Sequence, residues 1–144
     1  MNNQHLVCLV INSLGGGGAE RVFSRLVNML NNEKNNYKII VITLDNEKIE
    51  NPLHESIEHV HLNYNGSIFK SMLGLNRALK KIKPSLVVSF LTRSNVASVF
   101  SGFGETYPVI ISERVNTSSH FGNNLNSKLK KKFTRFFFTK KQIR

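Results

Sequence analysis

Three apolar runs rich in β-branched residues constrain the fold of this chain more than any other feature. They occupy residues 6–11, 39–44 and 86–91. A continuous run of this kind is typical of a strand that is buried on both faces of a parallel sheet. Apolar residues at helical spacing lie between the runs, at 22–30 and 68–82. The alternation predicts an α/β domain, with a Rossmann-like, mainly parallel sheet and helices on both faces.

Weaker patterns complete the predicted domain. Residues 45–58 are polar and predict a loop, and the alternation of histidines with apolar residues at 59–62 predicts a short, half-exposed strand. A second short strand is expected at 109–111. Between the last two strands, a helix is predicted from an apolar stripe that consists of Val96, Val99, Phe100 and Phe103.

The length of the chain limits it to one domain. Its 144 residues can bury a single core. We expect this domain to span residues 1–124, followed by a basic amphipathic helix or tail at 125–144. A helical stripe runs from 125 to 138, after which no closing strand follows. The predicted architecture is therefore truncated.

The positive charge of the chain is unevenly distributed. The net charge is +11, and eight of those charges come from residues 128–144, which contain no acid. This tail is expected to bind an anionic membrane surface. Cys8 is the single cysteine, and it lies within an apolar run, so a buried thiol in a reducing compartment is expected. No run approaches the roughly 18 apolar residues of a membrane span. The expected location is cytoplasmic, with a peripheral position at the inner membrane face.

The segment SLGGGGAERV, residues 13–22, contains four of the nine glycines and follows the first predicted strand. Ligands of parallel sheets bind beyond the carboxyl ends of the strands. The helix N-terminus there favours an anion, and glycines allow a phosphate or a sugar ring to come close to the backbone. The pattern therefore predicts that Gly15, Gly16, Gly17 and Gly18 face a ligand.

Two other phosphate-binding loops fit this segment less well. A P-loop requires Lys followed by Ser or Thr, and Ala19 and Glu20 stand there instead. A dinucleotide fingerprint requires G-x-G-x-x-G, and Glu20 occupies the place of the third glycine. Asp45, after the second predicted strand, is placed to hold a ribose. A dinucleotide-binding Rossmann protein therefore remains an alternative.

Three segments in the same order resemble one known family. They are SLGGGGAERVFSRLVNML at 13–30, IKPSLVVSFLTRSNV at 82–96 and PVIISERVN at 108–116. Together they resemble the N-terminal domain of the family 4 glycosyltransferases, which are two-domain enzymes of the GT-B fold. The resemblance covers roughly residues 5–120. Val115 is a departure, because asparagine often follows the arginine directly in that family.

The resemblance implies a function for the domain. Such enzymes transfer a sugar from a nucleotide-sugar donor to a glycan or lipid-linked acceptor, with retention at the anomeric carbon. The N-terminal domain mainly holds the acceptor, and the C-terminal domain binds the nucleotide. The resemblance implies that Gly15, Gly16 and Gly17, with Gly18 and Glu20 beside them, form a loop that the donor approaches. Without a C-terminal domain the chain is expected to be inactive, and no cofactor is expected besides the donor substrate.

Further polar residues are candidates for the site. Arg93, Glu113 and Arg114 follow predicted strands and are candidates for acceptor binding, and His120 is a weak candidate for a catalytic residue. No metal site is expected, because no cysteine or carboxylate accompanies the two histidines of the 59–62 strand. The alternative from another class is a non-catalytic module whose basic tail binds an anionic membrane or nucleic acid.

Overall fold

A computed structural model describes residues 5–32 and 37–113. In chain order its elements are β1 (His5–Ile11), α1 (Gly18–Asn32), β2 (Tyr37–Thr43), β3 (Glu58–His61), α2 (Ile68–Ile82), β4 (Leu86–Phe90), α3 (Thr92–Ser101) and β5 (Val109–Ser112). Each predicted strand and helix up to residue 113 is therefore present. The predictions for Arg114, His120 and the 125–144 tail lie outside the described residues.

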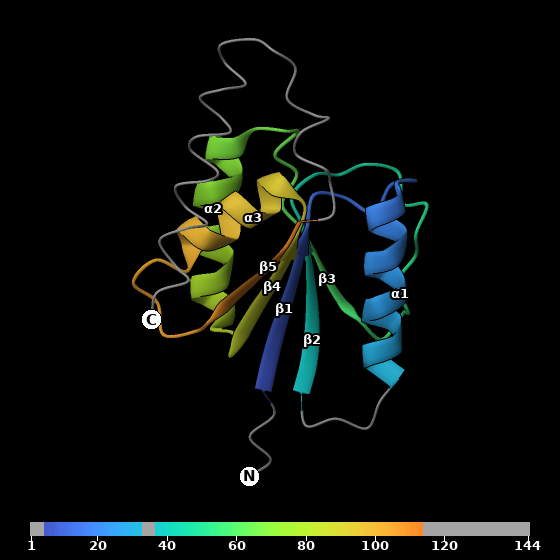
Figure 1. The fold of residues 1–144 in the computed structure, drawn as a ribbon, viewed down its shortest axis with the longest axis horizontal. Helices are drawn as coiled ribbons and strands as arrows, with labels where there is room; N and C mark the ends of the chain where they lie inside the picture. Colours follow the sequence, from blue (N-terminus) through green and yellow to red (C-terminus); the bar gives the residue numbers. More distant parts are fainter. Residues whose placement is uncertain (1–4, 33–36, 114–144) are drawn as a thin grey trace. The chain divides into compact units, whose positions relative to one another are not determined.

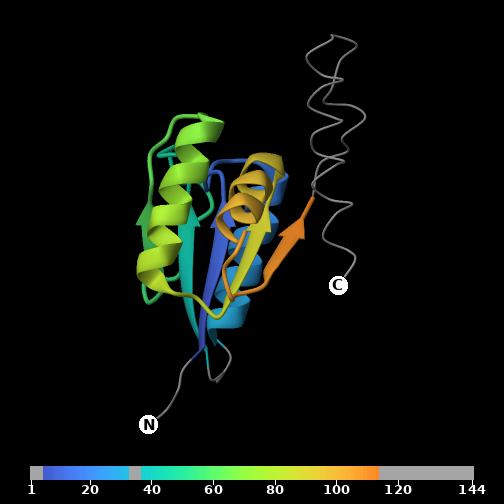
Figure 2. The same cartoon turned by 90° about the vertical axis from the view of Figure 1, so that its left-hand side faces the viewer.

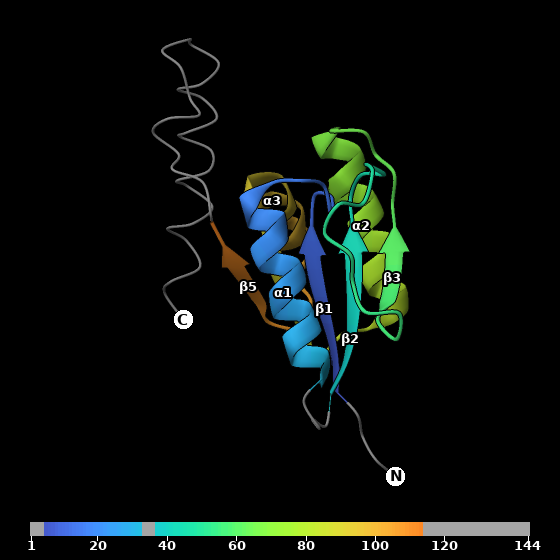
Figure 3. The same ribbon diagram turned by 90° about the vertical axis from the view of Figure 1, so that its right-hand side faces the viewer.

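The strands form one parallel sheet in the order β3-β2-β1-β4-β5. Figure 1 shows the strands between α1 on one side and α2 and α3 on the other, and Figure 3 shows the arrowheads of β1, β2, β3 and β5 at the same end of the sheet. This order is that of a doubly wound α/β domain. β2 and β3 are added on one side of β1, and β4 and β5 are added on the other side. Because all strands are parallel, the chain leaves β1, β2 and β4 at the same end of the sheet, where β5 also ends.

The two faces of the sheet bury alternate residues of the apolar runs. Val10 of β1 packs with Leu75 and Leu79 of α2 in one core cluster. Leu9 of β1 packs with Phe23 of α1 in the other. Figure 2 shows α2 and α3 together in front of the sheet, and Figure 3 shows α1 on the opposite face. Helices on both faces are thus confirmed.

The ends of α2 follow from its local sequence. Ser67 precedes the helix in an extended conformation, and its hydroxyl accepts a hydrogen bond from the Lys70 N–H. Lys83 ends the helix in a left-handed conformation, with its N–H bonded to the Leu79 carbonyl. Pro84 then prevents a further turn. These are the helix boundaries that the sequence predicts.

The buried face of α3 differs from the predicted apolar stripe. The helix buries small and polar side chains, namely Ser94, Asn95, Ala97, Ser98 and Ser101. Phe100 is 38% exposed, and Phe103 lies beyond the helix and is 85% exposed. The prediction was wrong about this face, because α3 packs closely beside α2 on the sheet and only short side chains fit there.

Two further expectations concern burial and membrane crossing. Cys8 is fully buried, as predicted, and burial, with a smaller contribution from the Glu58 charge, raises the pKa of its thiol to about 12. Among the described residues, no helix has the length and apolar character that crossing a membrane requires. The N-terminal region of α1 and the loop before it are the part of the fold that the sequence associates with ligand binding.

Candidate functional site

The glycine loop, defined here as residues 15–18, lies at the carboxyl end of β1, where α1 begins (Figure 3). Gly16, Gly17 and Gly18 are exposed, and Gly15 is half-buried. None of the four has a positive φ; the described glycines that do are Gly66 and Gly104. The loop therefore does not need glycine for its backbone conformation.

No backbone atom occupies the space above the glycine loop. A Cβ at Gly16 would lie 2.5 Å from Glu50 Oε2, which is the end of a flexible side chain. The atoms nearest to a Cβ at Gly17 belong to the Glu20 carboxylate, and a Cβ at Gly18 would meet nothing within 4 Å. Neither a positive φ nor contact with backbone atoms near the added Cβ positions explains the run of glycines.

The connection between β2 and β3 holds the glycine loop in place. The N–H groups of Glu50 and Asn51 each donate to the Leu14 carbonyl at 3.0 Å. The Asn51 side-chain amide donates to the Gly15 carbonyl, and the Ser13 hydroxyl donates to Glu47 Oε2 at 2.7 Å. The sequence predicts a polar loop at residues 45–58, but nothing in its composition indicates that it contacts the glycine loop.

Arg93 and Asp45 form a bidentate ion pair at the same edge of the sheet. Arg93 Nη1 donates to Asp45 Oδ1 at 3.0 Å, and Nη2 donates to Oδ2. Burial by itself would raise the pKa of Asp45, but hydrogen bonds from Arg93 and the Gly66 N–H and the charge of Arg93 together lower it. Arg93, predicted to bind an acceptor, thus already has a carboxylate partner, and Asp45, considered for a ribose, is already paired with the Arg93 guanidinium.

Glu113, the other described candidate for acceptor binding, follows β5 and is held by the start of α3. The Thr92 hydroxyl donates to Glu113 Oε2 at 3.1 Å, and the Asn95 amide lies 3.5 Å from the same oxygen. Asn95 is fully buried, and it also donates to the Ser112 carbonyl and accepts from the Ser89 hydroxyl. No local pattern in the sequence singles out Thr92 and Asn95, because only the fold brings them beside Glu113.

The junction between β4 and α3 contains an unusual backbone conformation. Leu91 has φ 74° and ψ 151°, a backbone conformation that residues other than glycine rarely adopt. Its N–H donates to the Ser112 carbonyl at 3.2 Å, and its own carbonyl accepts from the Asn95 N–H at 2.9 Å. Such strain clusters at functional sites. Here it directs the first turn of α3, with Thr92 and Arg93, toward the edge where the glycine loop lies.

The two histidines of β3 lie on the face of the sheet that α1 covers. His59 is in register with Val41, and His61 with Thr43. Burial and, to a lesser degree, the charge of His61 lower the pKa of His59 to about 4. In the described part of the chain, no group of three or more His, Cys, Asp or Glu side chains is arranged to hold a metal ion.

Comparison with known proteins adds to this geometry. No protein-family model matches the chain. Over 119 residues it is 32% identical to a Campylobacter jejuni GalNAc-alpha-(1->4)-GalNAc-alpha-(1->3)-diNAcBac-PP-undecaprenol alpha-1,4-N-acetyl-D-galactosaminyltransferase. The match includes 76% of this chain and 32% of that protein, so the chain spans about a third of the relative's length.

Two solved structures have a similar fold. The lipopolysaccharide outer core galactosyltransferase WaaB, in its apo form, matches 85% of this chain and 36% of its own, with a TM-score of 0.62 and 14% identity. The UDP-N-acetylglucosamine 2-epimerase of Rickettsia bellii matches 94% of this chain and 37% of its own, with a TM-score of 0.60 and 11% identity. Sequence and fold together are those of a GT-B glycosyltransferase-type domain.

Proposed function

We propose that this chain is the acceptor-side domain of a retaining family 4 glycosyltransferase, which moves a sugar from a nucleotide-sugar donor to a glycan or lipid-linked acceptor. The observation that carries the proposal is the exposed glycine loop at the carboxyl edge of the sheet. Neither a positive φ nor a packed backbone requires glycine at residues 16–18. A partner that comes close to the backbone from outside does require it.

The charges around the glycine loop indicate which part of the donor lies nearest to it. They favour the sugar over the phosphates. The carboxylates of Glu20, Glu47 and Glu50 lie next to the glycine positions. They counteract the positive end of the α1 dipole and repel a diphosphate. Sugar hydroxyls, in contrast, donate hydrogen bonds to carboxylates. In this proposal the diphosphate is held by a second domain, and the sugar faces the loop.

In this proposal the acceptor binds next to the start of α3. Glu113 and Thr92 offer polar groups there, and Arg93, although paired with Asp45, keeps 15% of its side chain exposed. The name of the Campylobacter jejuni relative describes a glycan linked through PP to undecaprenol. We infer that the acceptor of this chain is of the same class, a glycan carried on a lipid diphosphate. Arg114 and His120 remain candidates that lie outside the described residues.

Nuclear magnetic resonance of the labelled chain tests this assignment. We expect a short-chain prenyl diphosphate disaccharide to shift the amide signals of Thr92, Arg93 and Glu113. Uridine diphosphate alone should bind with a millimolar or weaker dissociation constant, which corresponds to about 4 kcal/mol or less. No sugar transfer is expected from the chain alone. Micromolar binding of NAD would overturn the proposal in favour of a dinucleotide-binding protein.

The basic tail supports a peripheral position at the inner membrane face as part of the same proposal. Residues 128–144 contribute eight cations and no acid, and each cation near an anionic surface contributes about 1 kcal/mol. Sedimentation with vesicles that contain phosphatidylglycerol should show binding that weakens at high salt. Equal binding by a chain that ends at Asn126 would show that the tail is not responsible.

A further inference from the structure

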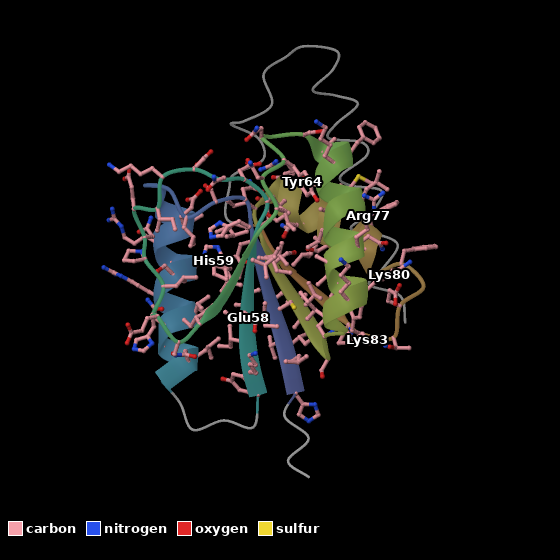
Figure 4. The ribbon with its side chains drawn as sticks, turned by 180° about the vertical axis from the view of Figure 1, so that it is seen from behind. Glu58, His59, Tyr64, Arg77, Lys80 and Lys83 are labelled. Carbon is pink, nitrogen blue, oxygen red and sulfur yellow. The ribbon has the colours of Figure 1, made fainter. Side chains whose placement is uncertain are left out.

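Two imidazoles and a hydroxyl converge where β3 pairs with β2. His59 Nε2 and His61 Nδ1 each lie 3.1 Å from Thr43 Oγ1, and the ring centroids are 3.8 Å apart. Alternate residues of a strand point to one face, which explains why the two histidines lie together. Thr43 joins them because its position in β2 is in register with His61. Figure 4 shows His59 on β3, the edge strand of the sheet.

The two hydrogen bonds of this cluster require the two ring nitrogens to be in different protonation states. A threonine hydroxyl has one proton, so it can donate to only one of the two ring nitrogens and accepts from the other. A metal ion between the two rings would replace the two hydrogen bonds to Thr43, because it accepts the lone pairs of both ring nitrogens. Both rings are placed for it, because His59 is half-buried beside Thr43 and His61 is exposed on the edge strand of the sheet.

The chemistry of the three atoms selects the kind of ion. Imidazole nitrogens suit Zn²⁺, Cu²⁺ and Ni²⁺, whereas Ca²⁺ and Mg²⁺ prefer several carboxylate or carbonyl oxygens. The nearest acidic residue of the same strand, Glu58, is 2.6 Å from Lys38 Nζ and is engaged there. We propose that His59 and His61 chelate one divalent transition-metal ion, with the Thr43 hydroxyl as a third contact.

A small movement of one side chain completes the site. Bonds of about 2.0–2.1 Å from both nitrogens to a tetrahedral Zn²⁺ place the ring centres about 5 Å apart. His61 can swing outward by about 1 Å, because it is exposed on the edge strand. Two ligands on β3 and one on β2 then join the edge strand to its neighbour. Bound metal therefore stabilises this pairing, since it binds the folded chain and not the separated strands.

This site is independent of the glycosyltransferase assignment, and its test needs no enzymatic activity. The probe is ZnCl₂ added to the full, tag-free chain at pH 7.5 in isothermal titration calorimetry. We expect one bound ion per chain and a higher melting temperature with zinc. The His61→Gln and His59→Gln variants should each weaken binding at least tenfold and lose the zinc-dependent rise in melting temperature. Of these two variants, His61→Gln should disturb folding less, because His61 is exposed and His59 is half-buried.

Matched controls use the other histidines of the chain. The variants His5→Gln, His54→Gln and His120→Gln should bind zinc as the wild type does. Substoichiometric Ni²⁺ should broaden the ring signals of His59 and His61 before those of the other histidines. The proposal is overturned if His61→Gln and His59→Gln bind zinc with unchanged affinity, or if the broadening follows His54 or His120 instead.

Discussion

Asp45 and Arg93 form a two-pronged ion pair that joins the end of β2 to the first turn of α3, 48 residues later in the chain. Both side chains are largely buried, with 10% and 15% of their surfaces exposed. Arg93 Nη1, which donates to Asp45 Oδ1, also lies 3.4 Å from the Ser71 hydroxyl of α2. The pair thus fixes three elements at the edge where the glycine loop and Glu113 lie.

Removing one member of this pair leaves the other charge largely buried without an oppositely charged partner. We expect Arg93→Leu to lower the free energy of unfolding by about 2 kcal/mol or more. The double variant Asp45→Asn/Arg93→Leu should lose less than the sum of the two single variants, because neither charge then remains. Urea unfolding measures these values, with Arg77→Leu on the exposed side of α2 as the control. Additive losses would contradict the pairing.

The same pair contributes to the acid stability of the chain. The pKa of Asp45 is lower in the folded chain than its ordinary value. The folded state therefore binds fewer protons than the unfolded state, and this stabilisation is present above about pH 4. It is lost as the pH falls through the folded pKa. We expect the unfolding free energy of wild type to fall more steeply below pH 4 than that of Asp45→Asn. Parallel curves would show that Asp45 does not contribute.

Gly74 of α2 is a glycine with a clear structural reason, because the ring of Tyr64 lies where its Cβ would stand. In an exposed helix Gly→Ala gains up to about 1 kcal/mol. Here we expect Gly74→Ala to lower the melting temperature, since the ring must leave its place. In a Tyr64→Ala background the same substitution should raise it. A stabilising Gly74→Ala in the wild-type chain would contradict the close packing of these residues.

Gly16 provides the test of the glycine loop. In an enzyme that joins this chain to a nucleotide-binding domain, we expect Gly16→Val to lower kcat/KM at least tenfold, or about 1.4 kcal/mol of transition-state stabilisation. The fold should be retained, because the φ of Gly16 is not positive and its added Cβ meets only the flexible Glu50 side chain.

A paired variant separates the two possible causes of that loss. Glu50→Ala removes the side chain whose atoms lie nearest to the new Cβ. If the donor is what the valine blocks, Gly16→Val/Glu50→Ala stays at least tenfold below Glu50→Ala. Recovery to the rate of Glu50→Ala, with melting temperatures measured beside the rates, would show that the loss came from Glu50 and not from a ligand.

The sequence by itself determined the order and type of the elements. Continuous apolar runs predict strands buried on both faces, and Pro84 predicts the end of α2, because these signals are local. The position of the glycine loop and of Glu113 at one edge followed as well. In a parallel sheet every strand ends on the same side, so no tertiary detail was needed.

Only the tertiary structure decided which side chains meet at that edge. The partner of Arg93 is Asp45, and Thr43 stands between His59 and His61, because strand register and the packing of α2 against α3 bring distant segments together. The apolar stripe predicted to be the buried face of α3 was wrong for the same reason. Periodicity shows that a helix has two faces, but the space left by neighbouring helices decides whether large apolar or small polar side chains are buried.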